Sequence, residues 1–285
     1  MIKLLFIILL SLNFTNAYGF IDFMKKNNRS ASITNLHKYI TLEDEWLNVS
    51  RPLQPIDLQG RIILLDFWTF CCINCIHTIP DLQYLEHKFG KDITVIGVHS
   101  AKFSNEQESD NIRQAILRYD VEHAVVNDAN FRIWQHFGVR AWPTLVLINP
   151  LGQIAGVYSG EGNRDRIESD IKDLRKEYAD ILNVGELPYD LEKNKAPKTI
   201  LNFPGKLEYS AERETLFISD SKNQRIIAVD LDGKIQITIG SGLEGKKDGS
   251  LAEAQFNSPQ GILYRDNKLY IADTDNHIIR VADFN

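Results

Sequence analysis

The sequence predicts an α/β layered domain followed by an all-β region, and three observations support this division. Residues 41–183 alternate apolar runs, typical of buried strands, with amphipathic helical segments. Residues 201–285 contain short β-like runs separated by turns and no helical pattern. Within this second region, residues 216–230 align without gaps on residues 269–283, which indicates a structural repeat.

The elements of the first domain follow one another in an order set by their hydrophobic patterns. The segment "GRIILLDFW" (60–68) is a glycine followed by a near-continuous apolar run, as expected for a strand buried on both faces. Buried strands are also predicted at 92–100 and 123–128, and a hairpin at 144–160. Apolar residues at helical spacing predict helices at 80–90, 111–120, 130–138 and 164–182.

The first residues, "MIKLLFIILLSLNFTNA", are typical of a secretory signal peptide, with Lys3 before an apolar run. That run is shorter than the ~20 residues of a membrane-spanning helix, and no other stretch of the mature chain is long and apolar enough. The alternative is an uncleaved anchor or a buried segment. We expect a signal peptide at 1–17, cleavage near Ala17, and export to the periplasm or outside the cell, where disulfides persist. A flexible segment follows at 18–40.

Residues 184–200 are polar, contain two prolines and are predicted to form a linker. The repeat after it has the pattern strand, Asp-containing turn, strand, and suggests blades of a β-propeller. The 85 residues at 201–285 suffice for about two blades, so the propeller is expected to be incomplete, as in a truncated product or a fragment. The shared residues Asp220 and Asp273 are expected to cap their turns, with a cation site as the alternative.

The three cysteines of the chain lie in "FCCINC" (70–75), where Cys72 and Cys75 form a C-x-x-C motif. The motif follows a predicted buried strand and begins a helix, which is the setting of a redox-active pair. Free N–H groups at a helix N-terminus stabilise a thiolate, the attacking species. We therefore predict Cys72 as the nucleophile and Cys75 as the resolving thiol.

This segment resembles the active site of thioredoxins, and "RAWPTLVLI" (140–148) resembles the segment that carries their cis-proline. The resemblance implies a buried carboxylate at Asp66, which would take the proton of Cys75; the alternative is a carboxylate satisfied by local hydrogen bonds. It also implies a substrate groove at Trp142 and Pro143, and it places Trp68 and Pro80 on the family's tryptophan and helix proline. Cys71 stands where the family carries Trp, either as a small replacement or as a third redox thiol.

"CCINC", "NSPQG" and "IADTDNHIIR" resemble NHL-repeat-containing proteins with an N-terminal thioredoxin-like domain. This resemblance implies an NHL-type propeller that binds a protein partner. The function predicted is an exported thiol–disulfide oxidoreductase acting on a protein dithiol or disulfide, with the direction of electron flow left open.

Other function classes remain as alternatives or are disfavoured. A non-catalytic interaction scaffold is one alternative. A copper site using Cys71, Cys75 and either His123 or His136 is another, although no metal or other cofactor is expected. C-x-x-C is followed by Ile76, so the pattern for covalent haem is absent. The net charge of −6, and ten basic against thirteen acidic residues at 201–285, argue against a nucleic-acid partner.

Overall fold

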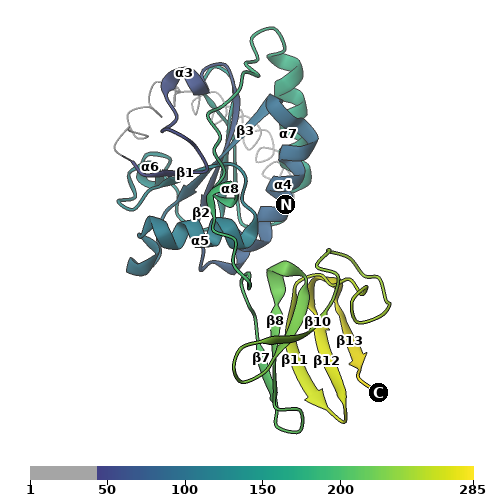
Figure 1. Ribbon diagram of the computed structural model, residues 1–285. Coiled ribbons are helices and arrows are strands. Elements are labelled where there is room, and N and C mark those ends of the chain that lie inside the picture. Colours follow the sequence, from purple (N-terminus) through teal and green to yellow (C-terminus); the bar gives the residue numbers. More distant parts are fainter. Residues whose placement is uncertain (1–43) are drawn as a thin grey trace, which may run out of the picture. The chain divides into compact units, whose positions relative to one another are not determined.

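The computed structural model describes residues 44–285 as two compact units, the first ending at Ala196 and the second comprising Pro197–Asn285 (Figure 1). The predicted signal peptide and the segment 18–40 lie outside the described residues. Each unit has buried hydrophobic clusters of its own. The predicted fold class, an α/β thioredoxin-like domain followed by an all-β segment, is confirmed. Among the helices of residues 44–285, none is both long and apolar enough to cross a bilayer.

A six-stranded mixed sheet with the order β1–β4–β3–β2–β5–β6 forms the centre of the first unit. Its strands are β1 (Trp46–Leu47), β2 (Ile62–Trp68), β3 (Ile93–His99), β4 (Ala124–Asn127), β5 (Thr144–Ile148) and β6 (Ile154–Ser159). β2, β3 and β4 are parallel, whereas β1, β5 and β6 run antiparallel to their neighbours. All seven residues of β2 are buried, as its apolar run predicted.

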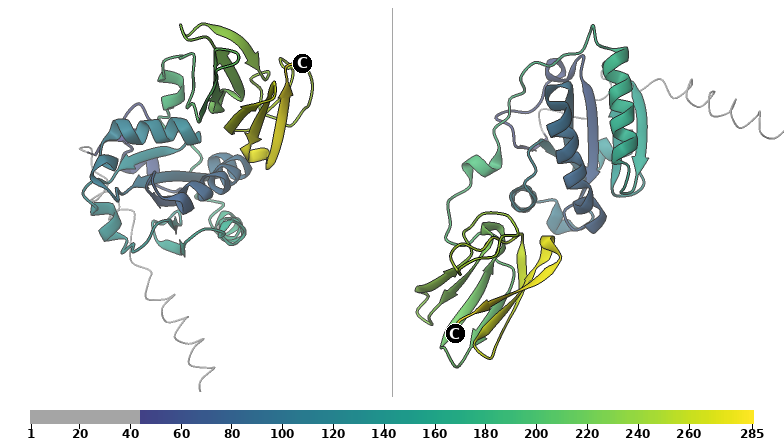
Figure 2. Two further views of the ribbon diagram at one scale, coloured as in Figure 1. Left: turned by 90° about the horizontal axis from the view of Figure 1, so that it is seen from below. Right: turned by 90° about the vertical axis from the view of Figure 1, so that its right-hand side faces the viewer.

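Helices cover both faces of this sheet. They are α3 (Pro55–Leu58), α4 (Ile73–Phe89), α5 (Ser109–Tyr119), α6 (Arg132–His136), α7 (Arg164–Glu177) and α8 (Glu192–Lys195), with the 3₁₀ turns η1 (Gly90–Asp92) and η2 (Ser104–Glu106). α4, α5 and α7 pack on one face, where Figures 1 and 2 show α4 and α7 side by side. α3 and α6 pack on the other. α4 begins at Ile73, earlier than the segment 80–90 whose periodicity predicted it.

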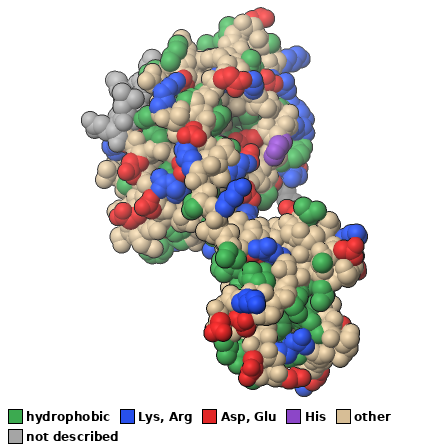
Figure 3. All heavy atoms as spheres, in the orientation of Figure 1, with side chains coloured by type: hydrophobic (Ala, Val, Ile, Leu, Met, Phe, Trp, Pro, Cys, Tyr) green, Lys and Arg blue, Asp and Glu red, His purple; other side chains and the backbone are tan. Residues whose placement is uncertain are grey.

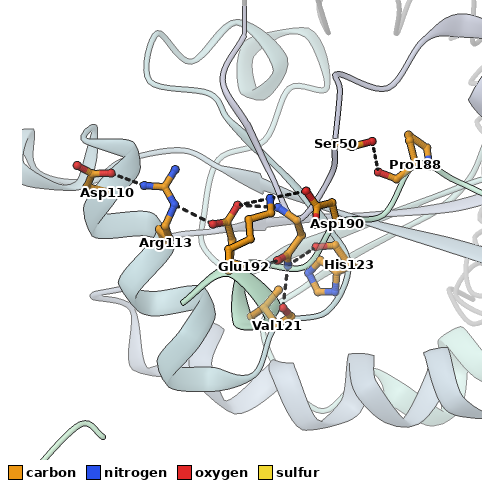
Figure 4. A network of polar contacts seen from close by, with 10 residues as sticks. Ser50, Asp110, Arg113, Val121, His123, Pro188, Asp190 and Glu192 are labelled. Carbon is orange, nitrogen blue, oxygen red and sulfur yellow. Dashed lines mark hydrogen bonds and ion pairs between the residues drawn. The ribbon is translucent and has the colours of Figure 1, made fainter. Parts of the chain in front are cut away.

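Part of the segment predicted as a linker, 184–200, packs against the first unit. Asn48 is fully buried, and its Nδ2 donates to the carbonyl oxygens of Val121 (2.8 Å) and His123 (2.9 Å). Its Oδ1 accepts the backbone N–H of Glu192 at 2.9 Å. Glu192 in turn accepts from Arg113 of α5, as Figure 4 shows. These contacts hold α8 against α5 and against the segment between α5 and β4.

Because three backbone groups would lose their partner, we expect Asn48→Ala to lower the free energy of unfolding of the first unit by about 3 kcal/mol. Asn48 also has a positive φ of 63°, which alanine adopts at a cost. Asn48→Gly keeps that φ accessible and separates the two causes. Urea unfolding followed by tryptophan fluorescence measures the loss. The control is Ser50→Ala, whose exposed hydroxyl donates to Pro188 at 3.3 Å; a loss there as large as at Asn48 would refute the assignment.

The second unit consists of two antiparallel sheets with a shared hydrophobic core. One contains β7 (Leu207–Ser210), β8 (Thr215–Asp220), β9 (Arg225–Val229) and β10 (Ile235–Ile239), and the other β11 (Pro259–Arg265), β12 (Lys268–Asp273) and β13 (Ile278–Asp283). Their inner faces meet around Phe217, Phe256 and Leu269. Acidic and basic side chains are interspersed over the face of each unit that Figure 3 shows.

The sequence repeat corresponds to a repeated structure. β8 and β9 are joined by η3 (Ser221–Asn223), and β12 and β13 by η4 (Thr274–Asn276). The buried carboxylate of Asp220 accepts the N–H of Asn202 at 2.7 Å and the side chain of Asn223 at 2.9 Å. Asp273 makes the equivalent bonds to Asn257 and Asn276. Both aspartates therefore tie the turn to the chain that enters the sheet. The expectation that they cap their turns is wrong, because neither side chain makes a capping bond to its own 3₁₀ turn.

Candidate functional site

Cys72 lies directly at the N-terminus of α4. It is the N-cap residue, with extended backbone angles (φ −88°, ψ 106°), and its Sγ accepts the backbone N–H of Cys75 at 3.3 Å. The residue is partly exposed, and all three cysteines are free thiols. The end of buried strand β2 and the start of α4 thus place this sulfur where N–H groups converge and a substrate can reach it.

Cys75 lies one turn into α4 and faces the core. The residue is fully buried and packs with Trp68 and Ile79. Desolvation, followed by the hydrogen bond to Cys72, raises the pKa of the Cys75 thiol well above its usual range, and the carboxylate of Asp66 raises it further. A group that accepts its proton is therefore needed before Cys75 can attack.

Asp66 projects from β2 and is 1% exposed. Its Oδ1 has no hydrogen-bond partner among the described residues, so local bonds do not satisfy both carboxylate oxygens. Desolvation raises the pKa of Asp66 to about 7; the nearby His123 lowers it and Glu86 raises it. A carboxyl group with this pKa can both take and return a proton near neutral pH.

Trp142 and Pro143 are joined by a cis peptide bond, as the resemblance predicted. The Trp142 side chain packs in the same cluster as Cys72, and its Nε1 donates to the carbonyl oxygen of Ser100 at 3.0 Å. Its ring lies 4.4 Å from that of Trp134, centroid to centroid. These contacts fix the orientation of the Trp142 ring.

Cys71 is exposed, and its backbone N–H donates to Oε1 of Glu106 at 3.0 Å. Desolvation of the thiol, and next the carboxylate of Glu106, raise the pKa of Cys71 to about 11. Glu106 comes from η2, after β3, and sequence reasoning missed it because no motif links it to the cysteines.

Two buried histidines lie on the same face of the sheet. His99, whose pKa desolvation lowers to about 4, accepts the N–H of Phe70 at its Nε2 (3.3 Å) and packs edge-on against Trp68. His123 contacts Oε2 of Glu86 through Nδ1 at 3.3 Å. Desolvation lowers the pKa of His123, but Glu86 and Asp66 outweigh it and raise the pKa overall.

Gly97 makes room for this cluster. It pairs with Asp66 in the parallel register of β2 and β3. A Cβ at this position would lie 3.0 Å from Nε1 of Trp68 and 3.3 Å from Nε2 of His123. A glycine inside a buried strand is the one sequence signal that could have indicated close approach of side chains here.

The residues proposed for copper do not form a metal site together. His123 is engaged by Glu86, and His136 lies at the end of α6. Within residues 44–285, no group of three or more His, Cys, Asp or Glu side chains is arranged to hold a metal ion.

Comparison with known proteins identifies relatives of both parts of the chain. Residues 60–154 match the family model described as thioredoxin-like. Human NHL repeat-containing protein 2 is 44% identical over 244 residues, covering 84% of this chain and 34% of the relative. The chloroplastic protein SUPPRESSOR OF QUENCHING 1 of Arabidopsis thaliana is 44% identical over 276 residues, or 93% and 26%. Thiol-disulfide oxidoreductase ResA of Halalkalibacterium halodurans is 25% identical over 122 residues, or 42% and 66%.

These findings confirm the resemblance predicted from the sequence. The first unit contains a thioredoxin-like domain with relatives among thiol–disulfide oxidoreductases. Most of the chain is similar to NHL repeat-containing protein 2. The chain spans about a third of the length of human NHL repeat-containing protein 2 and about a quarter of the length of the Arabidopsis protein.

Proposed function

Because this chain is a homologue of NHL repeat-containing protein 2 and carries a thioredoxin-like domain, we propose that it is a thiol–disulfide oxidoreductase using Cys72 and Cys75. The observation that carries the proposal is the arrangement of a partly exposed cysteine, Cys72, at the N-terminus of α4 and a buried cysteine, Cys75, one turn later. The backbone nitrogen of Cys75 lies 3.3 Å from Sγ of Cys72. A helix N-terminus with an accessible sulfur favours the thiolate that attacks disulfides.

The reaction proceeds in two exchanges. The Cys72 thiolate attacks one sulfur of a substrate disulfide, which forms a mixed disulfide and releases the other substrate sulfur as a thiolate that takes up a proton. The Cys75 thiolate then attacks Sγ of Cys72, forms the Cys72–Cys75 disulfide and releases the second substrate thiolate. The substrate gains two electrons and the protein loses them; the reverse sequence oxidises a dithiol.

Asp66 supplies the proton acceptor for the second exchange. Its carboxylate takes the proton of Cys75, directly or through a water molecule. The pKa of about 7 makes this carboxylate a base that is available near neutral pH and regains its proton afterwards. Trp142 and Pro143 form the wall of the groove in which the substrate chain lies against Cys72.

The second unit is proposed to bind a protein partner. Its two sheets and repeated turns support a propeller-type surface, here about two blades. The signal-peptide pattern of residues 1–17 supports export. Export fits the proposed reaction, because disulfides persist outside the cytosol. Fusion of residues 1–40 to a reporter that is active only outside the cytosol tests export, and a silent reporter contradicts it.

Equilibration of the full chain in glutathione buffers of graded potential, followed by alkylation and mass spectrometry, tests the redox assignment. We expect one cooperative two-electron transition that oxidises Cys72 together with Cys75 and leaves Cys71 alkylated. Coupling of Cys71 with Cys75 instead, or absence of any disulfide across the range, would contradict the assignment. Absence of any disulfide, in a chain that still binds a protein partner, would favour an interaction scaffold.

A further inference from the structure

Two adjacent cysteines precede α4, and the structure surrounds them with opposite chemistry. Cys72 has its sulfur at the N–H groups of the helix. Cys71 is next to the carboxylate of Glu106, a side chain that is 0% exposed. N–H groups favour a thiolate, whereas a neighbouring carboxylate favours the protonated thiol. The thiols are therefore inequivalent although they are neighbours in the chain.

Glu106 is held in place by three backbone N–H groups from two loops. Oε1 accepts from Cys71 at 3.0 Å, and Oε2 accepts from Lys102 at 2.8 Å and Phe103 at 2.9 Å. A buried carboxylate with this many donors is a specific feature, since burial of a charge is costly without such bonds. Desolvation raises the pKa of Glu106, but bonds from Cys71 and the loop outweigh it and lower the pKa overall, so the side chain stays ionised.

The charges around the Cys71 thiol act in opposite directions. Glu106 holds the proton on the sulfur, through both a hydrogen bond and its negative charge. Lys102, an exposed residue on the same loop, favours the thiolate. Cys72, Cys75 and His77 are the other titratable groups near this end of α4, and His77 pairs with Glu161. Asp66 faces Cys75 from β2, and His99 on β3 interacts with the charge of Glu106.

We propose that Glu106 is a positioning residue that selects which of the two adjacent cysteines reacts: it fixes the loop before α4 and keeps Cys71 protonated, so that Cys72 alone is the nucleophile. This inference rests on the proposed function for the role of Cys72. It assigns Cys71 as a spectator thiol under resting conditions, and it makes Glu106 the reason that a third thiol beside the C-x-x-C pair does not compete with Cys72 as the nucleophile.

Single-cysteine chains test the proposal without requiring turnover. In the full-length Cys72→Ser, Cys75→Ser variant, Cys71 is the only thiol, so intact mass after timed iodoacetamide treatment reports its reactivity across pH 6–10. Adding Glu106→Gln is expected to speed alkylation at pH 8 by about tenfold, the thiolate gain of one pKa unit. In the Cys71→Ser, Cys75→Ser chain, the same substitution is expected to change the Cys72 rate less than about twofold.

A second variant keeps the proposal testable if Glu106→Gln misfolds, since that substitution removes one oxygen acceptor of the loop. Lys102→Met alters only an exposed side chain and is expected to slow Cys71 alkylation, because it removes the charge that favours the thiolate. Glu108→Gln, an exposed carboxylate two positions away, is the matched control and should leave both rates unchanged.

The outcomes separate the two proposals. Equal acceleration of Cys71 and Cys72 by Glu106→Gln would overturn the selection role, because a loosened loop exposes both sulfurs. An unchanged Cys71 rate in both Glu106→Gln and Lys102→Met would also overturn it. If Cys72 alone reacts no faster than a cysteine peptide, the proposed function fails, while the effect of Glu106 on Cys71 is still measured.

Discussion

Replacing Cys72 by serine is expected to reduce the reduction of a disulfide-bonded peptide to the uncatalysed rate, because serine supplies no thiolate for the first exchange. Cys75→Ser keeps that first exchange and removes the second, so the mixed disulfide on Cys72 should accumulate in about one equivalent of the chain. A peptide with a fluorophore and a quencher on either side of its disulfide measures turnover, and intact mass under non-reducing conditions measures the trapped species.

Cys71→Ser is the matched control for this pair of variants. It removes the neighbouring thiol from the same loop, yet we expect turnover within about twofold of the unmodified chain because Cys71 is protonated. Normal turnover by Cys72→Ser would refute the assigned nucleophile. Loss of turnover in Cys71→Ser, together with a mixed disulfide on Cys71, would transfer that role to Cys71.

Asp66→Asn is expected to stabilise the first unit at pH 8 and to have little effect at pH 4. The pKa of Asp66 rises from 3.8 in the unfolded chain to about 7 in the folded one, so the folded state binds the proton more tightly. Its contribution to stability is fully present below pH 3.8 and is lost as pH rises through about 7. Removal of the buried charge therefore raises the free energy of unfolding at pH 8 by about 4 kcal/mol, and asparagine resembles the protonated acid at pH 4.

Tryptophan fluorescence reads this change selectively, since all four tryptophans (46, 68, 134 and 142) lie in the first unit. Urea unfolding under reducing conditions at pH 4 and pH 8 gives the comparison, and Asp173→Asn on the exposed side of α7 is the control. An Asp66→Asn chain that is destabilised equally at both pH values would mean that the carboxylate is not protonated on burial.

The same variant separates the two exchanges kinetically. Asparagine cannot take the proton of Cys75, so we expect the second exchange near pH 7 to slow by about a hundredfold, while formation of the mixed disulfide is unchanged. Rapid quenching with acid followed by mass spectrometry resolves the two steps. Slowing of the first exchange alone would place Asp66 in a different role.

Much of the fold followed from local patterns. The apolar run of β2, the hairpin of β5 and β6, and the aligned turns at Asp220 and Asp273 each depend on neighbours in the chain, and their structures agree with expectation. The cis bond before Pro143 followed from resemblance. The apolar periodicity at 80–90 located only the later turns of α4, because Ile73 is exposed and the first turn has no apolar repeat; the C-x-x-C motif located its start.

The contacts that sequence reasoning missed are long-range. The 184–196 segment packs against the first unit through Asn48 and Glu192, which are far apart in the chain and belong to no motif. Glu106 lies 35 residues after Cys71 in a loop of unremarkable composition. Likewise, the closeness of His123 to Asp66 depends on the register of β2, β3 and β4 and on the absence of a side chain at Gly97.

The amino-acid sequence alone determined the two-part architecture and located the C-x-x-C motif of Cys72 and Cys75 at the start of a helix, because hydrophobic period and motif spacing are local properties that persist in any compact arrangement. Only the tertiary structure decided the electrostatic setting of each thiol. Burial raises the pKa of Asp66 to about 7, and a carboxylate from another loop distinguishes Cys71 from Cys72. Desolvation and charge proximity depend on which side chains the fold brings together, and no single segment encodes them.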